Sequence, residues 1–568
     1  MTVTGPTDAR RASRDDLVVD RLHVAFDGVT AVDDVSFTLG PGECVALVGE
    51  SGSGKSVTAR ALLGLTGGQV TADALRLGED DLLTLTERRW RRVRGPRIGL
   101  VLQDALVSLD PLRPVGREID DALRLHTRLS PAERRARVLE VLHEVGMPEP
   151  EVRRGLRAGE LSGGLRQRAL IAAALALRPG VVVADEPTTA LDAEVQRVVV
   201  DRLAALRDGG TAVLAISHDL GVVRRLADRV VIMRDGRVVE QGPTARVLDS
   251  PEAEYTRMLI AALPGGAPRG TRLSAPVATG FDPEAPPSGG ALGSTAQVTP
   301  RPGATQESAP TSPTAPEPVL VAAGLRRAFA VRGGPDRVAV DDVSLTLHAG
   351  ETLGLVGASG SGKTTTARLL LGLDEPDVGT VELLGEPWSP RRERDRRPLR
   401  GALGDVYQDP SSSFDPRFTV GRLLADALSA GRSTRLRPLE AEVGALLGRV
   451  GLTADLAQRR PETLSGGQRQ RVAVARALAP RPRVIVCDEP VSALDVSVQA
   501  QVLDLLDRLQ RDEGLAYLFI SHDLDVVEHM ADRVAVMHEG RIVEDGLTTE
   551  VFGTPRHAHT RALLAARP

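Results

Sequence analysis

Two octapeptides in this 568-residue chain share one pattern of glycine, lysine and hydroxyl side chains: GESGSGKS and GASGSGKT. They contain Lys55 and Lys363, the only lysines among 71 lysine and arginine residues, and both fit G-x-x-x-x-G-K-[ST]. Glycines at this spacing let backbone N–H groups turn inward around phosphate oxygens, and a helix that starts here adds its positive end. Lysine is a compact charge on a flexible stem that reaches β- and γ-phosphates, whereas the planar fork of arginine does not fit in the same way. The pattern therefore predicts two nucleoside triphosphate sites.

The predicted phosphate-binding residues form two matching sets, in which the hydroxyl of Ser56 or Thr364 would ligate Mg²⁺. The first set is Gly49, Glu50, Ser51, Gly52, Ser53, Gly54, Lys55, Ser56 and Val57, and the second is Gly357, Ala358, Ser359, Gly360, Ser361, Gly362, Lys363, Thr364 and Thr365. The alternative is a chance glycine-rich turn. Its occurrence twice, each time between an apolar run and a helical pattern, argues against that alternative.

Two acidic pairs, Asp185–Glu186 and Asp488–Glu489, end the apolar runs VVVA and VIVC. A carboxylate at the end of such a strand is suited to direct Mg²⁺, and the glutamate after it is suited to polarise an attacking water. Each pair also precedes a proline, so an acidic helix cap is the alternative. Beside a phosphate loop, we favour Asp185 and Asp488 as Mg²⁺ residues and Glu186 and Glu489 as catalytic residues.

Each motif occurs once in each half of the chain, which indicates a duplicated domain. Between the copies the sequence is rich in Pro, Gly, Ala, Ser and Thr and has almost no periodic apolar content, which is typical of a disordered tether. We therefore expect a disordered N-terminus at 1–15, a first domain with a C-terminal extension at 16–264, a linker at 265–317 and a second domain with its own extension at 318–568.

Within each copy, short β-branched runs such as VVVAD and TAVLAIS alternate with longer stretches of helical period. This alternation predicts an α/β fold with a largely parallel sheet. The spans Asp104–Glu160 and Asp409–Thr463 lack such runs, and we interpret them as helical inserts.

Composition limits the classes of function. The net charge of −5 argues against a general nucleic-acid binder, so we expect no nucleic-acid partner. Cys44 and Cys487 lie in apolar runs and cannot supply a cysteine zinc site or an iron–sulfur cluster. The longest apolar stretches fall far short of the ~20 residues that span a bilayer, and the N-terminus has no apolar core typical of a secretory signal. A function at a membrane would need another chain for the crossing.

The segments LSGGLRQR at Leu161 and LSGGQRQR at Leu464 resemble the signature of ATP-binding-cassette (ABC) ATPases, and with the other motifs the resemblance covers nearly the whole chain outside the tether. It implies two P-loop NTPase domains, each with a RecA-like core, an antiparallel β subdomain and a helical subdomain. It also implies ATP as the nucleotide. By resemblance, Gln103 and Gln408 are the glutamines that reach Mg²⁺, Asp192 and Asp495 belong to the D-loops, His218 and His522 are the switch histidines, and Phe26 and Phe329 stack on adenine.

In this family the signature helix faces the nucleotide of the opposite cassette. The resemblance therefore implies that ATP on Lys55 meets Ser465, Gly466 and Gly467, and that ATP on Lys363 meets Ser162, Gly163 and Gly164. Both halves come from one chain, so the cassette dimer would be intramolecular, with two sites competent for hydrolysis. Leu165 stands where the second signature has a polar residue, and we expect it to tune the rate of one site.

Longer segments, such as ISHDLGVVRRLADRVVIMRDGRVVEQG and YQDPSSSFDPRFTVG, resemble the two ATP-binding subunits of dipeptide, oligopeptide and nickel importers, here fused. That resemblance implies import of peptides, or of nickel or metal chelates, together with two integral-membrane permeases and an extracytoplasmic substrate-binding protein. It also implies a position on the cytoplasmic face of the cell membrane. The alternatives are an exporter ATPase and a soluble tandem ATPase that acts on ribosomes, whose charged helical arm the tether does not resemble. A DNA-repair cassette protein would need zinc-binding cysteines that this sequence lacks.

Overall fold

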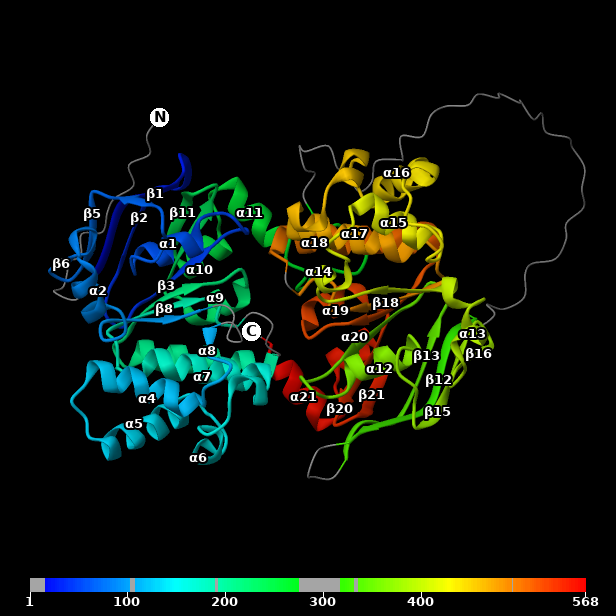
Figure 1. Ribbon diagram of the computed structural model, residues 1–568, viewed down its shortest axis with the longest axis horizontal. Coiled ribbons are helices and arrows are strands. Elements are labelled where there is room, and N and C mark those ends of the chain that lie inside the picture. Colours follow the sequence, from blue (N-terminus) through cyan, green and yellow to red (C-terminus); the bar gives the residue numbers. More distant parts are fainter. Residues whose placement is uncertain are drawn as a thin grey trace, which may run out of the picture.

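The computed structural model describes residues 16–102, 108–188, 193–274, 317–330, 336–492 and 494–567. Figure 1 shows the two halves of the chain side by side, with the first half in blue to green and the second in yellow-green to red. The two halves repeat one plan, which confirms the predicted α/β fold with two domains.

The centre of the first half is a six-stranded sheet in the order β11-β10-β3-β9-β8-β7. Its strands are β3 (Cys44–Val48), β7 (Ile98–Val101), β8 (Val181–Asp185), β9 (Ala212–Ile216), β10 (Arg229–Arg234) and β11 (Arg237–Pro243). All neighbours are parallel except the pair β10 and β11. Every residue of β3, β8 and β9 is buried, as expected for parallel strands that helices cover on both faces.

A second, antiparallel sheet lies over one side of this core. It contains β1 (Leu17–Phe26), β2 (Val29–Leu39), β4 (Gln69–Thr71), β5 (Ala74–Leu77) and β6 (Asp80–Asp81), in the order β2-β1-β5-β6 with β4 also paired to β1. One hydrophobic cluster joins both sheets to α1 (Lys55–Ala61), because Val45 and Leu47 of β3 pack with Leu22 and Val24 of β1 and with Leu62. This packing fixes the start of α1 against the two sheets.

The predicted insert is helical in its described part, with α4 (Val115–His126), α5 (Pro131–Glu144) and α6 (Pro150–Arg153). Ser130 caps α5 through a reciprocal pair of bonds with Glu133, which satisfies two backbone donors at the helix start. The insert packs on α7 (Gly163–Leu175), which begins at the first LSGG segment. Helices α8 (Ala193–Asp208) and α9 (Leu220–Leu226) complete the core.

The second half repeats these elements. Its antiparallel sheet has the order β13-β12-β15-β16, and its core sheet the order β17-β18-β19-β14-β20-β21. The strands are β12 (Pro318–Phe329), β13 (Arg337–His348), β14 (Thr352–Val356), β15 (Val378–Leu383), β16 (Glu386–Ser389), β17 (Leu403–Val406), β18 (Val484–Asp488), β19 (Ala516–Ile520), β20 (Arg533–His538) and β21 (Arg541–Leu547). The helices are α12 (Lys363–Leu370), α13 (Glu393–Arg396), α14 (Pro410–Ser413), α15 (Val420–Leu428), α16 (Glu440–Arg449), α17 (Gly466–Leu478), α18 (Val496–Glu513) and α19 (Leu524–Met530).

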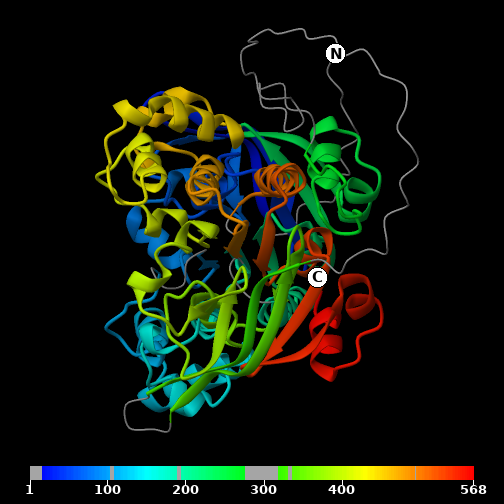
Figure 2. The same cartoon turned by 90° about the vertical axis from the view of Figure 1, so that its right-hand side faces the viewer.

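Each half ends in two short helices, α10 (Thr244–Asp249) and α11 (Glu254–Ala261) in the first, α20 (Thr548–Gly553) and α21 (Ala558–Ala565) in the second. Figure 2 shows both pairs on the same side of the molecule, the first in green and the second in red. The linker was expected to begin at residue 265. Residues 265–274 instead pack on the second half of the chain and do not extend into solvent. Leu273 is only 3% exposed there and belongs to the hydrophobic core of the second half. The rest of the expected linker, residues 275–316, and the expected N-terminal tail lie outside the described residues.

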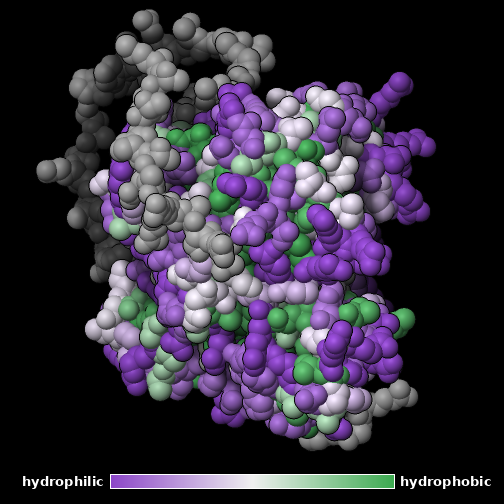
Figure 3. Space-filling model, turned by 90° about the vertical axis from the view of Figure 1, so that its left-hand side faces the viewer, coloured by the Kyte–Doolittle hydropathy of each residue, from purple (hydrophilic) through white to green (hydrophobic). Residues whose placement is uncertain are grey.

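The surface of the first half is mixed. Figure 3 shows hydrophilic side chains over most of this face, with hydrophobic ones in small scattered groups. Within the part of the chain that the structure describes, no helix is both long and apolar enough to cross a bilayer.

Candidate nucleotide-binding sites

The first glycine-rich octapeptide forms the turn between β3 and α1. Gly49 has φ 154°, and a Cβ there would lie 2.1 Å from the carbonyl oxygen of Met233, so only glycine fits. Lys55 is 6% exposed, and its Nζ donates to the carbonyl oxygens of Gly49 and Glu50, both at 2.7 Å. Burial lowers the pKa of Lys55. The ammonium is thus held inside a ring of backbone groups, where a phosphate can take over its hydrogen bonds.

The second octapeptide repeats this geometry between β14 and α12. Gly357 has φ 153°, and Lys363 donates to the carbonyl oxygens of Gly357 at 2.6 Å and Ala358 at 3.0 Å. The loop opens into a cavity of about 560 Å³. Phe329 also lines this cavity and is 41% exposed, with the Arg327 guanidinium 5.2 Å from the ring centroid. An exposed aromatic ring at the mouth of such a cavity is available for stacking on a base.

Phe26, the predicted counterpart of Phe329, lies in a different environment. It packs against the hydrophobic cluster of the first half, and its ring lies so close to Gly68 that a Cβ there would be 2.8 Å from Cε1. Its predicted stacking on adenine stays a prediction.

A hydroxyl and a carboxylate meet beside each lysine. The Ser56 hydroxyl donates to Asp185 Oδ1 at 3.0 Å, and Thr364 makes the equivalent hydrogen bond to Asp488. Burial raises the pKa of Asp185, while burial and the neighbouring Glu489 raise the pKa of Asp488 to about 6. Carboxylates that are costly to ionise, each with a hydroxyl next to it, fit a site that a hard divalent cation neutralises. The residues present therefore suit Mg²⁺.

Each catalytic glutamate predicted from the sequence lies next to its predicted histidine. His218 Nδ1 is 3.5 Å from Glu186 Oε1, and His522 Nδ1 is 3.2 Å from Glu489 Oε1. Burial disfavours the charged form of both histidines, but the hydrogen bond and the charge of the glutamate outweigh it and raise the pKa of each. Burial likewise opposes ionisation of Glu489, yet His522 lowers its pKa. The carboxylate is thereby kept ionised, as a base that polarises water must be.

Gln408 reaches the same carboxylate, because its Nε2 donates to Glu489 Oε2 at 2.7 Å. The second site therefore joins the predicted Mg²⁺ glutamine to the predicted catalytic base directly. Its counterpart Gln103 lies outside the described residues, as does Asp192 of the first D-loop.

The seam between the halves brings the second signature to the first phosphate loop. Ser465, Gly466 and Gly467 line a cavity of about 670 Å³ together with Glu50 and Ser51. The backbone N–H of Ser51 donates to Asp495 Oδ2 at 3.4 Å, and the hydroxyl of Ser497 donates to Glu50 Oε1. The predicted head-to-tail arrangement places ATP on Lys55 between two segments: the phosphate-loop wall at Glu50 and Ser51 and the signature wall at Ser465–Gly467. These two walls lie side by side.

The two signature helices differ at their first turn. Ser465 accepts from the N–H of Gln468 at 3.3 Å while Gln468 Oε1 accepts from the N–H of Ser465 at 3.1 Å, which is a complete capping box. Ser162 starts α7 with no side-chain cap, and Leu165, at the position of Gln468, has no oxygen that could accept from the N–H of Ser162. The cavity around Lys363 is lined by residues of the second half. The predicted contact of Ser162, Gly163 and Gly164 with that site stays a prediction.

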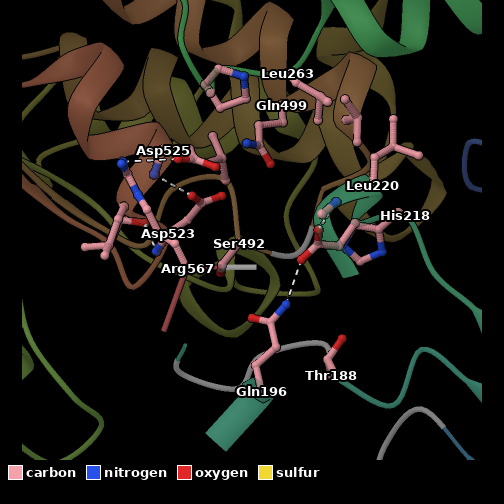
Figure 4. A pocket seen from close by; sticks show the side chains of 18 of the residues that line it. Thr188, Gln196, His218, Leu220, Leu263, Ser492, Gln499, Asp523, Asp525 and Arg567 are labelled. Carbon is pink, nitrogen blue, oxygen red and sulfur yellow. Dashed lines mark hydrogen bonds and ion pairs between the residues drawn. The ribbon is translucent and has the colours of Figure 1, made fainter. Parts of the chain in front are cut away.

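The two histidine loops face one another across a central cavity of about 300 Å³. Figure 4 shows His218 and Leu220 on one side of it and Asp523, Asp525 and Arg567 on the other. His218 of the first site and His522 of the second therefore line the same cavity at the seam.

One residue at the first site carried no signal in the sequence. The hydroxyl of Tyr255, on α11, accepts from the backbone N–H of Glu50 at 3.3 Å, and the ring is covered by Arg234 at 4.9 Å. A lone tyrosine in an amphipathic helix is usually a core residue, so only the fold reveals that α11 touches the phosphate loop.

Comparisons with known proteins agree with this geometry. A profile described as ABC transporter matches residues 32–189 and 340–492, and one described as the oligopeptide/dipeptide transporter C-terminal region matches residues 239–290. The chain is 43% identical over 570 residues to the peptidoglycan transport ATP-binding protein YejF of Agrobacterium fabrum, covering 97% of this chain and 96% of that one. It is 41% identical over 576 residues to the glutathione import ATP-binding protein GsiA of Escherichia coli K12, covering 97% and 89%.

Among solved structures, a dimeric ATP-binding cassette, MJ0796, bound to ADP and Pi matches 40% of this chain and 98% of its own with 25% identity and a TM-score of 0.37. The family profile covers more than half of the chain, and the curated relatives cover nearly all of it. Two phosphate loops, two signatures and two glutamate–histidine pairs in one polypeptide thus identify the chain as a member of the ABC transporter family, a tandem ATP-binding protein that hydrolyses ATP.

Proposed function

We propose that this chain powers an importer of peptides or peptide-like compounds. It would lie on the cytoplasmic face of the membrane, with two integral permeases and an extracytoplasmic binding protein as its partners. The observation that carries the proposal is the approach of Ser465, Gly466 and Gly467 to Glu50 and Ser51 across the seam. When ATP is held between two halves of one chain, its binding closes the two halves together and its hydrolysis lets them open.

The roles of the residues follow from their positions. Lys55 and Lys363 would exchange their carbonyl contacts for phosphate oxygens, and the signature helices would present their N-termini to the γ-phosphate. Glu186 and Glu489 would polarise the attacking water, with His218 and His522 orienting them. Ser56 with Asp185, and Thr364 with Asp488, would hold Mg²⁺, which neutralises phosphate charge when bound.

The proposed cargo rests on the relatives. These relatives are named for peptidoglycan transport and glutathione import, and the matched C-terminal region is that of oligopeptide and dipeptide transporters. Peptidoglycan fragments and glutathione share amide bonds between amino acids and free carboxylates. Nickel and metal chelates are the other cargo class for this type of ATPase, and transport would separate the two.

The test is uptake into proteoliposomes that contain the chain with its co-purified permeases and binding protein. We expect ATP-dependent uptake of a labelled short peptide and no uptake of nickel. Glu186→Gln with Glu489→Gln should abolish both hydrolysis and uptake while ATP binding persists. Full ATPase activity in this double variant would contradict the catalytic assignment, and uptake of nickel in place of the peptide would contradict the cargo.

A further inference from the structure

The segment that follows α11, residues 262–274, leaves the first half and is built into the second. Two backbone N–H groups at its end, those of Leu273 and Ser274, donate to the two carboxylate oxygens of Asp504 at 3.0 and 2.8 Å. Asp504 lies on α18 and is 8% exposed, and Leu273 beside it is 3% exposed. The end of the segment is thus fixed by a buried acceptor and a buried apolar side chain.

A second anchor lies in the middle of the segment. Arg269 Nη2 donates to Gln510 Oε1 at 2.8 Å, and the same guanidinium forms an ion pair with Asp532. The ring of His529, which is 2% exposed, places Nδ1 3.2 Å from the carbonyl oxygen of Ala267. We call Asp504, Gln510, His529 and Asp532 the seat of this segment.

The same positions of the first half show that the seat is specific to the second half. There, Asp201, Arg207, Arg225 and Asp228 occupy the places of the four seat residues. Arg225 Nη2 donates to Asp201 Oδ1 at 2.7 Å, and Arg207 Nη1 lies 3.6 Å from Asp228 Oδ1. The first half therefore satisfies both carboxylates with its own arginines.

In the second half, these arginines are replaced by His529 and Gln510, and the partners of the two carboxylates come from the other half of the chain. Arg269 pairs with Asp532 in place of Arg207 with Asp228, and the amides of Leu273 and Ser274 take the place of Arg225. The second half lacks the internal partners of these two carboxylates where the segment supplies others, which indicates a dedicated interaction surface with residues 262–274 of the same chain as its partner.

The position of the segment gives it a consequence for the nucleotide. It continues directly from α11, and the first turn of this short helix carries Tyr255, whose hydroxyl accepts from Glu50 in the phosphate loop of Lys55. Ala262 and Ser274 line the same cavity as Ser465 of the second signature. The segment therefore connects the phosphate-loop wall of the first site to the half that carries its signature wall.

We propose that residues 262–274 are an intramolecular clamp that keeps the two walls of the first ATP site close together when nucleotide leaves. Opening of the cassette dimer then takes place mainly at the second site, around Lys363. The inference rests on the proposed function only in taking ATP as the agent that closes the seam.

Distances measured by double electron–electron resonance test the clamp in the full chain, because both native cysteines are buried and so are shielded from the spin-label reagent. One spin-label pair, at Glu252→Cys and Glu462→Cys, spans the first site, and the matched pair, at Arg556→Cys and Gly159→Cys, spans the second. Both are placed in the Glu186→Gln, Glu489→Gln background. We expect a short, narrow distance across the first site with and without MgATP, and a long, broad distance across the second site that shortens with MgATP.

Two variants should release the clamp. Arg269→Ala with Asp504→Asn removes both anchors, and Gln510→Arg gives the second half the arginine that the first half has at 207, so that Asp532 is satisfied without Arg269. In either variant the first-site distance without nucleotide should lengthen and broaden to match the second, and MgATP should restore it. Asp201→Asn, at the position equivalent to Asp504, should leave the first-site distance unchanged.

The outcomes separate the clamp from the proposed function. An unchanged first-site distance in Gln510→Arg, with its thermal unfolding at the temperature of the parent, would overturn the clamp. So would a first site that opens as far as the second in the parent. If MgATP changes neither distance in any variant, nucleotide-driven closure itself fails, and the proposed function fails with it.

Discussion

At the scale of single residues, the carboxylates beside the phosphate loops lower the stability of the folded protein. Asp488 ends β18, and burial together with the charge of Glu489 raises its pKa from an ordinary 3.8 to about 6. A carboxyl group whose pKa is raised on folding destabilises the folded state at pH values above both pKa values. That cost disappears as the pH falls below them.

Asp488→Asn should therefore make the nucleotide-free protein more stable at pH 7.5, by at most about 3 kcal/mol for a shift of about two pKa units. The gain should shrink as the pH falls through 6 towards 4. Thermal unfolding of both proteins across this range measures it. The variant should also lose the extra stability that MgATP gives the parent, because Asp488 is a predicted Mg²⁺ residue. An equal or lower unfolding temperature of the variant at pH 7.5 would contradict this explanation.

The residue after the signature glycines should make the two sites unequal. In the capping box, the Ser465 hydroxyl accepts from the N–H of Gln468, so its own hydrogen is free to be donated to phosphate. Ser162 makes no such hydrogen bond, and Leu165 in place of the glutamine cannot complete a capping box.

Leu165→Gln should raise the turnover of the site that uses Ser162 by about fivefold, the worth of one hydrogen bond of about 1 kcal/mol. ATPase assays in the Glu186→Gln background isolate this site, because the first site is inactive there. Gln468→Leu in the Glu489→Gln background is the reciprocal change and should lower turnover at the first site. Equal rates before and after both changes would show that the cap does not orient the hydroxyl.

At the scale of elements, the sequence was sufficient to predict the structure wherever one short segment carries both the pattern of the fold and the functional residues. The strand, glycine turn and helix around Lys55, the acidic strand end at Asp185 and the insert after position 104 were predictable because periodicity and turn chemistry are local. Contacts between distant segments were not. Tyr255 meets Glu50 across 205 positions and Leu273 meets Asp504 across 231, and neither pair has a local pattern. The glycine-rich composition of 265–274 predicted disorder, and the buried Leu273, its contact with Asp504 and the anchor at Arg269 order it.

Packing between elements also fixes where the signature helix starts. A Cβ on Gly467 would lie 2.4 Å from Cγ1 of Val498, in the first turn of α18, so the start of α17 rests directly on the helix that follows the D-loop. Gly467→Ala should move these helices apart, cost about 1–3 kcal/mol of unfolding free energy and lower ATPase activity. Adding Val498→Ala makes room for the methyl group and should restore both. Chemical denaturation and ATPase assays check this, and failure of the second change to restore activity would mean that the glycine is needed for phosphate contact and not for packing.

At the scale of the whole molecule, the arrangement of the two halves determines which substitutions affect the same ATP site. Ser465 lines the cavity of the Lys55 loop, so Lys55→Ala and Ser465→Arg should both damage the first site and leave the second intact. Lys55→Ala with Ser162→Arg should damage one wall of each site. In the Glu186→Gln, Glu489→Gln background, the first double variant should therefore retain one tightly bound MgATP per chain and the second should retain none. Both carry one changed lysine and one changed serine, so each controls for the number of lesions. Retained-nucleotide counts after desalting give the answer, and equal retention by the two variants would mean that each half closes on its own ATP.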